Sequence, residues 1–591
     1  MTGHSRSTTL TRLSRFAAAA ALPLTIALPA LAGLPAAIDR VPADAVFVLS
    51  IRNIAELKSD LDAVGAKLPP LQQALNESPL GMVLAMPGLN PDASVAACVL
   101  GDTFDPAAGD PPMVVVVPVT DAKGFMQGLG LTETGGVWSG DLGGSPTHMK
   151  DIGEGFVAMS QTSETLASFD GKSGKGSAHA KRLGQTGNAL ADTSDVLFYA
   201  DLAKLKGVID QGMAQMKQQM EMVAMMAGPS GEQMNQTMAM LESIASTLTS
   251  EGDLAIMGAS ITGAGISFDA GAQFKEGTET YKGLQHKGDS TAVLSRVPSM
   301  PYFMAFGADT SGEFVRRIVT EAQKMQGQAG SFFPAEDMMS KLDGMAFVMG
   351  TSPAIMAGGL FANSIVFQQT KNATDVIKSM QGGMEKLNGT TVNGMKFATS
   401  YKAAEATIAG TPVDAWSMRM SVDPNDPNAM AAQQMSQAMM MIWGPGMGPS
   451  GYIAGTKTGI IQTLSKNTML IEKAIQVAEA GNGLGADASI KSTASNLPAD
   501  RAAEMYLGVG EMLKTASGFM AMMGGGAGFT VPDNLPPVGM AITTHGGGAG
   551  TRIFLPIEVL SAVADIQRQM EGGMDEGADA EEAPAGSKPR Y

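Results

Sequence analysis

A turn, a strand and a helix follow one another in residues 40–66, and this unit recurs along the chain. The apolar run at 46–51 has the length and composition of a buried strand. Ile54, Leu57 and Leu61 follow it at spacings of three and four, which predicts an amphipathic helix. Similar units occur in three further segments, namely 194–209, 297–318 and 497–517. Such a chain folds only if its strands meet in sheets that the helices cover.

The recurring units form two ordered series, one in residues 40–290 and one in 291–570. The last pair is the clearest, because 254–284 and 538–566 each read as a strand, a glycine-containing turn, a second strand and a helix. Six pairs of similar segments in the same order predict an internal duplication. Because glycine hairpins separate the strands, we predict an α+β fold with mainly antiparallel sheets and amphipathic helices, and not a doubly wound parallel sheet. The predicted domains are two duplicated halves, 33–290 and 291–570.

Residues 1–32 have the pattern of a secretory signal peptide. Arg6, Arg12 and Arg15 form a basic start, an apolar run covers 16–28, and the small residues Ala30 and Ala32 mark a cleavage site before Gly33. The apolar run is too short, and too interrupted by proline, to predict a membrane span. The sequence therefore predicts an exported protein, periplasmic or extracellular after cleavage, with no transmembrane span in the mature chain.

The mature chain is strongly acidic. The whole sequence has a formal net charge of -17, and removal of three arginines and no acid with the signal makes it -20. A chain of this charge repels nucleic acid, so we predict no nucleic-acid partner. The segment 571–591 combines acidic and small residues and is predicted to be a disordered tail. Cys98 lies in the apolar run 95–100, which predicts a buried packing residue and not a nucleophile.

Methionine is unusually frequent, with 45 residues, and it concentrates in 212–252, 430–441 and 518–524. The first stretch reads as a helical hairpin broken near Gly228 and Gly231, with apolar stripes on both helices. The candidate ligand or partner surface consists of Met213, Met216, Met220, Met222, Met225, Met226, Met234 and Met238.

Three interpretations of these methionines remain open. Apolar stripes at helical spacing are usually packed in a core. Alternatively, flexible thioether side chains form an adaptable surface for a lipid, a peptide or a second subunit. A cuprous-ion site at Met213, Met216 and Met220 is the third interpretation, because soft thioethers bind this ion. The histidines of the mature chain have no metal-ligand spacing that would support this third interpretation, so it is the least favoured of the three. We therefore predict no cofactor and no metal site.

Sequence motifs for catalysis are absent. The chain contains no G-x-S-x-G, no H-E-x-x-H and no S-x-x-K motif. The glycine run after His545 is similar to an oxyanion loop, but it occupies the place of the turn at 263–265 in the other half and is predicted to be a hairpin turn. The acidic loop 423–428 has proline where a calcium loop needs a ligand, so a turn is the simpler prediction.

One family resemblance follows from these elements. The Pro-Ala-Asp opening at 42–44 is followed by 114–125, by 135–138 with Trp138, and by 155–160. This arrangement resembles uncharacterised exported bacterial proteins of a domain-of-unknown-function family. The resemblance implies an envelope or secreted location and transfers no functional residues.

These observations favour an exported, non-enzymatic binding or scaffold protein of the cell envelope. The first alternative is a carrier of lipid or another hydrophobic ligand that uses the methionine-rich helices. The second alternative is a hydrolase with dispersed acidic residues, which requires two carboxylates in one cleft.

The cleavage prediction is testable by N-terminal sequencing of exported protein. We expect the mature chain to begin at Gly33, because signal peptidase cleaves after small residues such as Ala30 and Ala32. Exported material that begins at Met1 would contradict this prediction.

Overall fold

The computed structural model of the protein describes most of the chain after residue 32. The described residues are 33–68, 86–101, 104, 111–227, 231–318, 340–352, 359–392, 394–426, 448–522 and 529–578, with single residues at 433, 436, 439–440 and 442–444. Helix and antiparallel sheet alternate along this part of the chain, so the fold is α+β, as predicted.

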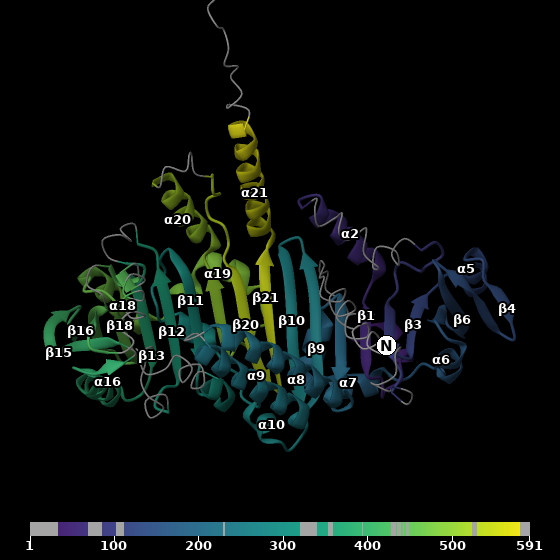
Figure 1. Cartoon of the computed structure of the whole chain (residues 1–591), viewed down its shortest axis with the longest axis horizontal. Coiled ribbons are helices and arrows are strands. Elements are labelled where there is room, and N and C mark those ends of the chain that lie inside the picture. The colour runs from purple at the N-terminus through teal and green to yellow at the C-terminus, as the bar shows by residue number, and fades with distance from the viewer. Residues whose placement is uncertain are drawn as a thin grey trace, which may run out of the picture.

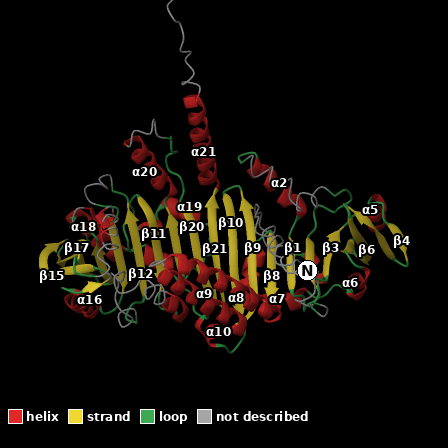
Figure 2. Cartoon of the chain, in the orientation of Figure 1, coloured by secondary structure: helices red, strands yellow, loops and turns green. Residues whose placement is uncertain are grey.

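One continuous sheet crosses the whole molecule (Figures 1 and 2). In the described residues every pairing of the named strands is antiparallel. From one end to the middle the strands are β4 (Thr132–Thr134), β5 (Val137–Leu142), β6 (Ser145–Gly153), β7 (Phe156–Ser160), β3 (Met113–Pro118), β2 (Val95–Val99), β1 (Phe47–Ile51), β8 (Val196–Asp201), β9 (Gly252–Thr262) and β10 (Gly265–Phe274).

The sheet continues from β10 into the second part of the chain. There the order is β21 (Gly548–Pro556), β20 (Val538–His545), β19 (Ala503–Leu507), β11 (Tyr302–Asp309), β12 (Gly344–Gly350), β13 (Asn363–Gln369), β18 (Gly459–Thr463), β17 (Ser450–Gly455), β16 (Thr411–Val422), β15 (Met395–Ile408) and β14 (Thr391–Val392). The junction between β10 and β21 therefore joins residues almost 300 positions apart into one ladder.

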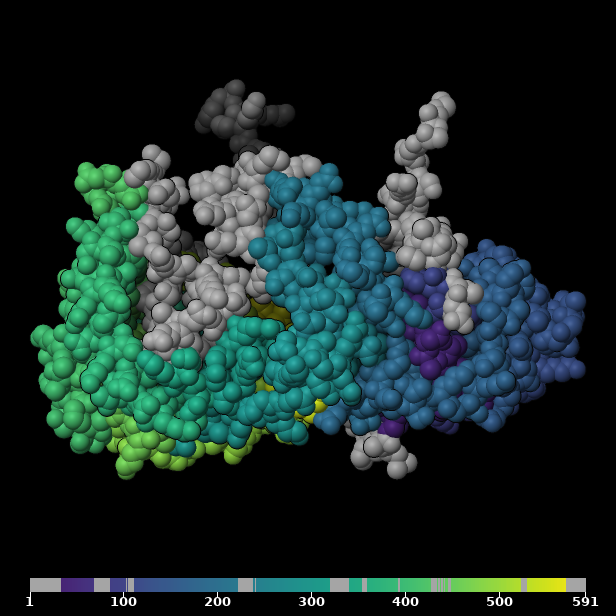
Figure 3. All heavy atoms as spheres, turned by 90° about the horizontal axis from the view of Figure 1, so that it is seen from below, coloured from purple at the N-terminus to yellow at the C-terminus, as the bar shows by residue number. Residues whose placement is uncertain are grey.

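Helices connect and cover these strands. They are the 3-10 turn η1 (Ala36–Arg40), α2 (Ile54–Gly65), α5 (Ala122–Gly128), α6 (Ser163–Ser168), α7 (Gly176–Thr193), α8 (Leu202–Ala227), α9 (Gly231–Glu251), α10 (Glu279–Gly283), α11 (Ser290–Leu294), α16 (Ala373–Leu387), α18 (Thr468–Ala480), η4 (Leu484–Ala486), α19 (Ala488–Ala494), α20 (Val509–Met522) and α21 (Ile557–Ala578). Figure 1 shows α2, α20 and α21 beyond the same ends of the strands, at the top of the view. In Figure 3 the segment of α8 and α9, blue to teal, projects from the body.

Two hydrophobic cores lie on one face of the central strands. In the first, Leu197 and Tyr199 of β8 pack with Leu183 and Leu190 of α7. The second core contains Tyr506 and Phe554 of the other half together with these residues of α11, α18 and α19: Leu294, Ile471 and Ile490. Because side chains alternate along a strand, burying these residues turns their neighbours to the opposite face of the sheet.

Local predictions from the sequence are largely confirmed. The predicted strand and helix in 40–66 appear as β1 and α2, and Asn53 caps α2 by accepting a hydrogen bond from the Glu56 N–H. The glycine run after His545 is a two-residue turn, in which Gly546 and Gly547 have φ of 59° and 76°. These left-handed values suit glycine, since other residues pay a steric penalty there.

The structure also differs from the sequence analysis in three places. The long hairpin of β15 and β16 and the helix α7 were not predicted. Helix α21 continues to Ala578, so the first residues of the predicted acidic tail 571–591 are helical. The glycines at 572, 573 and 577 are poor helix formers, but extending a helix that has already begun costs less than starting one, and Glu571, Met574 and Glu576 favour the extension. The rest of the predicted tail lies outside the described residues.

The burial of Phe367 gives a test of the fold. This side chain is fully buried on β13, between Ala346 of β12 and Ile461 of β18. Phe367→Ala leaves a cavity in the core and should lower the free energy of unfolding by about 3 to 5 kcal/mol, measured by urea unfolding followed by circular dichroism. Met469→Ala is the matched control, because Met469 is 76% exposed and its loss should cost less than about 0.5 kcal/mol. Equal unfolding midpoints for the two variants would contradict the described packing.

Candidate functional site

The face of the central sheet opposite the two cores carries apolar side chains that remain partly exposed. On β8, Phe198 is half-buried while its neighbours Leu197 and Tyr199 are buried. Met257 of β9 is 47% exposed and Ile553 of β21 is 38% exposed. We call this surface the open face. Single exposed apolar residues are common, but a contiguous exposed apolar surface usually marks a binding site.

Strand register arranges these residues in rows across the sheet. One row of directly opposed residues runs Val95, Ile51, Val196, Ala259, Phe268, Ile553, Met540, Met505, Phe306, Phe347, Val366. The adjacent row runs Ala97, Leu49, Phe198, Met257, Ala270, Thr551, Ile542, Ala503, Ala308, Met345. Directly opposed residues of antiparallel strands share a face. Together the two rows form an uncharged band, which we call the apolar track.

The apolar track is long. Neighbouring strands lie about 4.8 Å apart, so a row across eleven strands extends about 48 Å. Thr551 is the only polar side chain in either row. Its outer parts are buried: Val95 and Ile51 pack in a cluster with α2, and Ala308, Met345 and Ala503 pack in a cluster of the second half. The exposed part lies at the middle, where β8, β9 and β10 of the first half meet β21 of the second.

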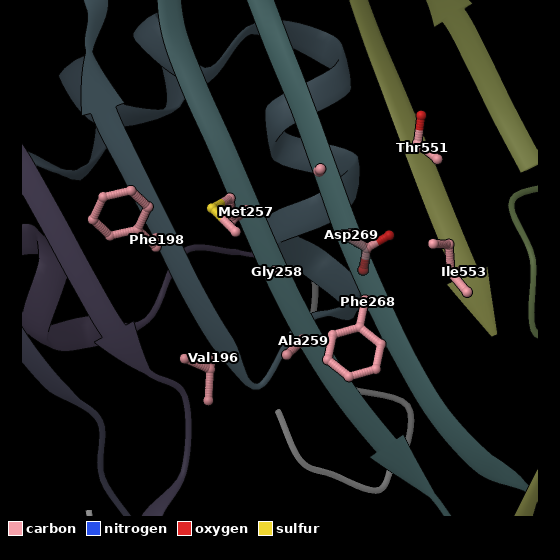
Figure 4. Close-up of a pocket in the computed structure, with 10 residues that line it drawn as sticks. Val196, Phe198, Met257, Gly258, Ala259, Phe268, Asp269, Thr551 and Ile553 are labelled. Carbon is pink, nitrogen blue, oxygen red and sulfur yellow. The ribbon is translucent and has the colours of Figure 1, made fainter. Parts of the chain in front are cut away.

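A pocket of about 170 Å³ lies at this central part of the track (Figure 4). Its lining comes from β8, β9, β10 and β21 and consists of Val196, Phe198, Met257, Gly258, Ala259, Phe268, Asp269, Ala270, Thr551 and Ile553. Figure 4 shows the strands side by side with a helix behind them. The one acid of the lining, Asp269, is buried and bonded to Arg552. The accessible surface of the pocket is therefore almost entirely apolar.

Apolar clusters lie at the two ends of the strands that form this central region. At one end, Ile54 and Leu57 of α2 pack with Ile261, Ile266 and Ile557, and Val196 lies against them. At the other end, Leu205 and Val208 of α8 pack in one cluster with two half-buried aromatic side chains. These are Phe198 of the track and Phe47 of the neighbouring strand β1. The helices that follow β1 and β8 thus border the pocket.

The methionines predicted as a ligand surface lie on α8 and α9. Met213, Met216 and Met220 are half-buried on α8, and Met238 of α9 is buried. The other four, Met222, Met225, Met226 and Met234, occupy positions within these helices, but their side chains lie outside the described residues. Lys217 Nζ of α8 lies 2.8 Å from Glu242 Oε1 of α9, which ties the two helices together. The proposed role of these eight residues as a binding surface stays a prediction.

The structure brings together a serine, a histidine and an aspartate that the sequence analysis did not identify. Ser311 Oγ lies 2.9 Å from His286 Nε2, and it donates a hydrogen bond of 2.5 Å to Asp309 Oδ1. Asp309 Oδ2 lies 3.6 Å from the same His286 Nε2. In a hydrolytic triad the carboxylate instead binds Nδ1, on the far side of the imidazole from the serine. The order of contacts is therefore wrong for nucleophilic catalysis.

Asp309 has a structural role in this loop. Its carboxylate accepts hydrogen bonds from the backbone N–H groups of Asp289 and Ser311, at 3.0 Å each. Burial acts to raise the pKa of Asp309, but hydrogen bonds from Ser311 and Asp289 outweigh it, and the pKa is lowered. A carboxylate held in its charged form by backbone donors is a poor proton acceptor at neutral pH.

Other reactive groups are buried in the cores. Cys98 is 2% exposed, and burial raises the pKa of its thiol to about 12. Tyr199 and His179 are hydrogen-bonded to each other at 2.7 Å, and the other ring nitrogen of His179 lies 2.9 Å from the carbonyl of Val41. Within the described ranges, no group of three or more His, Cys, Asp or Glu residues has a geometry for a metal ion.

The comparison with known proteins adds no assignment. The chain matches no protein-family model, no curated protein and no solved structure. Among the helices that the structure describes, none combines the length and apolar character needed to cross a bilayer.

The buried state of Cys98 predicts its reactivity. The thiolate is the reactive form, and a pKa of about 12 leaves very little thiolate at about pH 8. We expect a thiol reagent to label the folded protein at least about 100-fold more slowly than the urea-unfolded protein, whose thiol has a pKa near 8.5. Because the folded pKa is raised, labelling of the folded protein should stay slow from about pH 7 to 9. Rapid, stoichiometric labelling of the folded protein would contradict the described position of Cys98.

Proposed function

We propose that this protein is an exported, non-enzymatic binding protein of the cell envelope, and that its partner lies on the apolar track. The observation that carries the proposal is the exposed apolar surface at the middle of the track, where Met257 and Phe268 of the first half adjoin Ile553 of the second. Export is supported by the signal-peptide pattern of residues 1–32. The resemblance to uncharacterised exported bacterial proteins agrees with this proposal.

The exposed part of the track would gain free energy if a partner covered it. Burying one Met, Ile or Phe side chain contributes roughly 1.5 to 3 kcal/mol, and Met257, Ile553 and Phe268 are only partly buried. A partner that covers them gains this free energy. An uncharged surface also avoids the cost of desolvating charged groups on binding.

We also propose that residues 33–290 and 291–570 derive from one duplicated unit. The supporting observation is the order of strand pairing. Strand β8 pairs with β1 and β9, and β19 pairs in the same way with β11 and β20. The fully buried Tyr199 and Tyr506 occupy the corresponding positions of β8 and β19. Under this proposal each half supplies one half of the track.

A carrier of lipid or another hydrophobic ligand is the second candidate. It is favoured by the apolar pocket on the track, which has α2 on one side and α8 on the other. The methionine-rich helices α8 and α9 contact the strands that form the pocket, and adaptable side chains suit an irregular ligand. A protein partner and a lipid would both bind through the exposed apolar side chains of the track, so experiments are needed to distinguish them.

Charge substitutions on the track test the binding proposal. Met257→Glu and Ile553→Glu each place a carboxylate on the track, and each should weaken binding of a fluorescent fatty acid at least about tenfold if the ligand is lipid. Met469→Glu is the matched control, because it adds the same charge at an exposed methionine of α18, a helix that packs on the other face. Native mass spectrometry of the mature protein, purified from an envelope fraction, reports bound lipid independently.

The outcomes distinguish the candidates. Lipid bound to the unsubstituted protein and lost in both track variants supports the carrier. Absence of lipid, with cross-linking to an envelope protein that the track variants lose, supports the binding protein. If the two track variants behave as Met469→Glu does in both assays, the track has no binding role and the proposal is wrong. Unfolding midpoints close to that of the unsubstituted protein ensure that the variants are folded.

A further inference from the structure

The two strands that meet at the junction between the halves, β10 and β21, pair symmetrically with respect to the turns that precede them. Thr262 pairs with Gly265 across a two-residue turn at the start of β10, and His545 pairs with Gly548 across a two-residue turn at the start of β21. Asp269 is the fourth residue after Gly265, and Arg552 is the fourth after Gly548. These two residues are directly opposite each other in the antiparallel ladder of β10 and β21.

Pairs on either side follow the same symmetry. Ser267 is opposite Phe554, and Gly271 is opposite Gly550. Counted as residues after Gly265 and after Gly548, the second position of each strand is opposite the sixth position of the other. The pair of Asp269 and Arg552 therefore lies on a local two-fold axis of the ladder. Any residue on such an axis would face itself if the strand paired with a second copy of the same strand.

The two residues on this axis have opposite charges, and Asp269 is buried while Arg552 is largely buried. The Asp269 side chain has no exposed surface, and the Arg552 side chain is 11% exposed. Arg552 Nε donates to Asp269 Oδ1 at 2.7 Å, and its second nitrogen donates to Oδ2 at 2.9 Å. This bidentate geometry satisfies both carboxylate oxygens. Arg552 also donates to the Thr193 hydroxyl at the end of α7.

We propose that the Asp269–Arg552 pair determines which strand edges join: it makes β10 and β21 complementary to each other and incompatible with themselves. If β10 of one molecule paired in the same register with β10 of another, two buried aspartates would meet. If β21 paired with β21, two arginines would meet. Burial makes like charges repel strongly, because water no longer screens them. The pair thus directs the two halves of one chain onto each other and prevents association of two molecules through the same edges.

Specificity is a better account of this pair than stability. Desolvating two charges offsets much of their attraction, so uncharged replacements of a buried ion pair are often tolerated. The unpaired backbone N–H and C=O groups of an edge strand, by contrast, can form hydrogen bonds with any other strand. Side chains must therefore prevent pairing with the wrong strand. An opposite-charge pair on the symmetry axis has this effect, because pairing of either strand with a second copy of itself would place two like charges opposite each other.

The test compares four variants of the full-length mature protein. Asp269→Arg and Arg552→Asp each create a like-charge pair, the double variant Asp269→Arg with Arg552→Asp exchanges the charges, and Asp269→Asn with Arg552→Met removes them. Each protein is refolded from urea at low and at high concentration. Thermal melting reports stability, and sedimentation velocity reports the fraction of dimer. Thr193→Val is the control for the hydrogen bond from Arg552 to α7.

We expect each single reversal to lower the melting temperature more than Thr193→Val does, and the exchanged pair to recover most of that loss. The uncharged pair should melt close to the unsubstituted protein, but refolding at high concentration should give at least tenfold more dimer. If the exchanged pair melts no higher than the single reversals, charge complementarity is not the basis of the junction. If the uncharged pair gives no more dimer than the unsubstituted protein, the pair does not determine which edges join, and the proposal is overturned.

Discussion

The antiparallel ladder between β10 and β21 is the interaction on which the rest of the structure depends. Without it, each half would end in a strand with unpaired backbone groups, and such edges readily associate with other chains. With it, strands from both halves form one sheet from β4 to β14. Residues 265–273 are opposite residues 548–556 without a register shift. Every longer row of side chains across the sheet depends on this register.

The ladder also places the two cores on one side of the sheet. Leu197 and Tyr199 contact α7, while Tyr506 and Phe554 contact the core of the second half. A strand that buries these residues must turn the alternate ones to the other face. There, α2 and α8 lie on either side of the central part of the track, and Met257 and Ile553 stay exposed. An exposed apolar surface of this kind is the basis of the binding role proposed for the protein.

The groups with possible chemistry support this interpretation by their environments. Cys98 is buried and its pKa is raised, so it is not a nucleophile. Ser311, His286 and Asp309 are close together, but the carboxylate binds the serine and lies on the wrong side of the imidazole. Proximity of the right residue types is therefore insufficient, since the order of hydrogen bonds determines which atom loses its proton.

The sequence alone determined the elements whose signals are local. The apolar run before Arg52 and the spacing of Ile54, Leu57 and Leu61 predicted β1 and α2, because strand and helix periodicity are set by neighbouring residues. The turn at Gly546 followed from glycine's tolerance of positive φ. Helix α7 was missed because glycine interrupts its apolar pattern: Gly184 is non-helical, so the two helical segments join across a kink.

Only the tertiary structure decided which strands lie side by side. Alternation along β10 shows that Phe268 and Asp269 lie on opposite faces, but it does not reveal that Ile553 and Arg552 are opposite them. Backbone hydrogen bonds pair any two strands, so the choice of neighbour comes from packing and charge across the whole sheet. The apolar track and its pocket are built from residues hundreds of positions apart, and no local pattern contains them. The physical reason is that a strand's own sequence specifies its two faces, whereas its neighbours are specified by the rest of the fold.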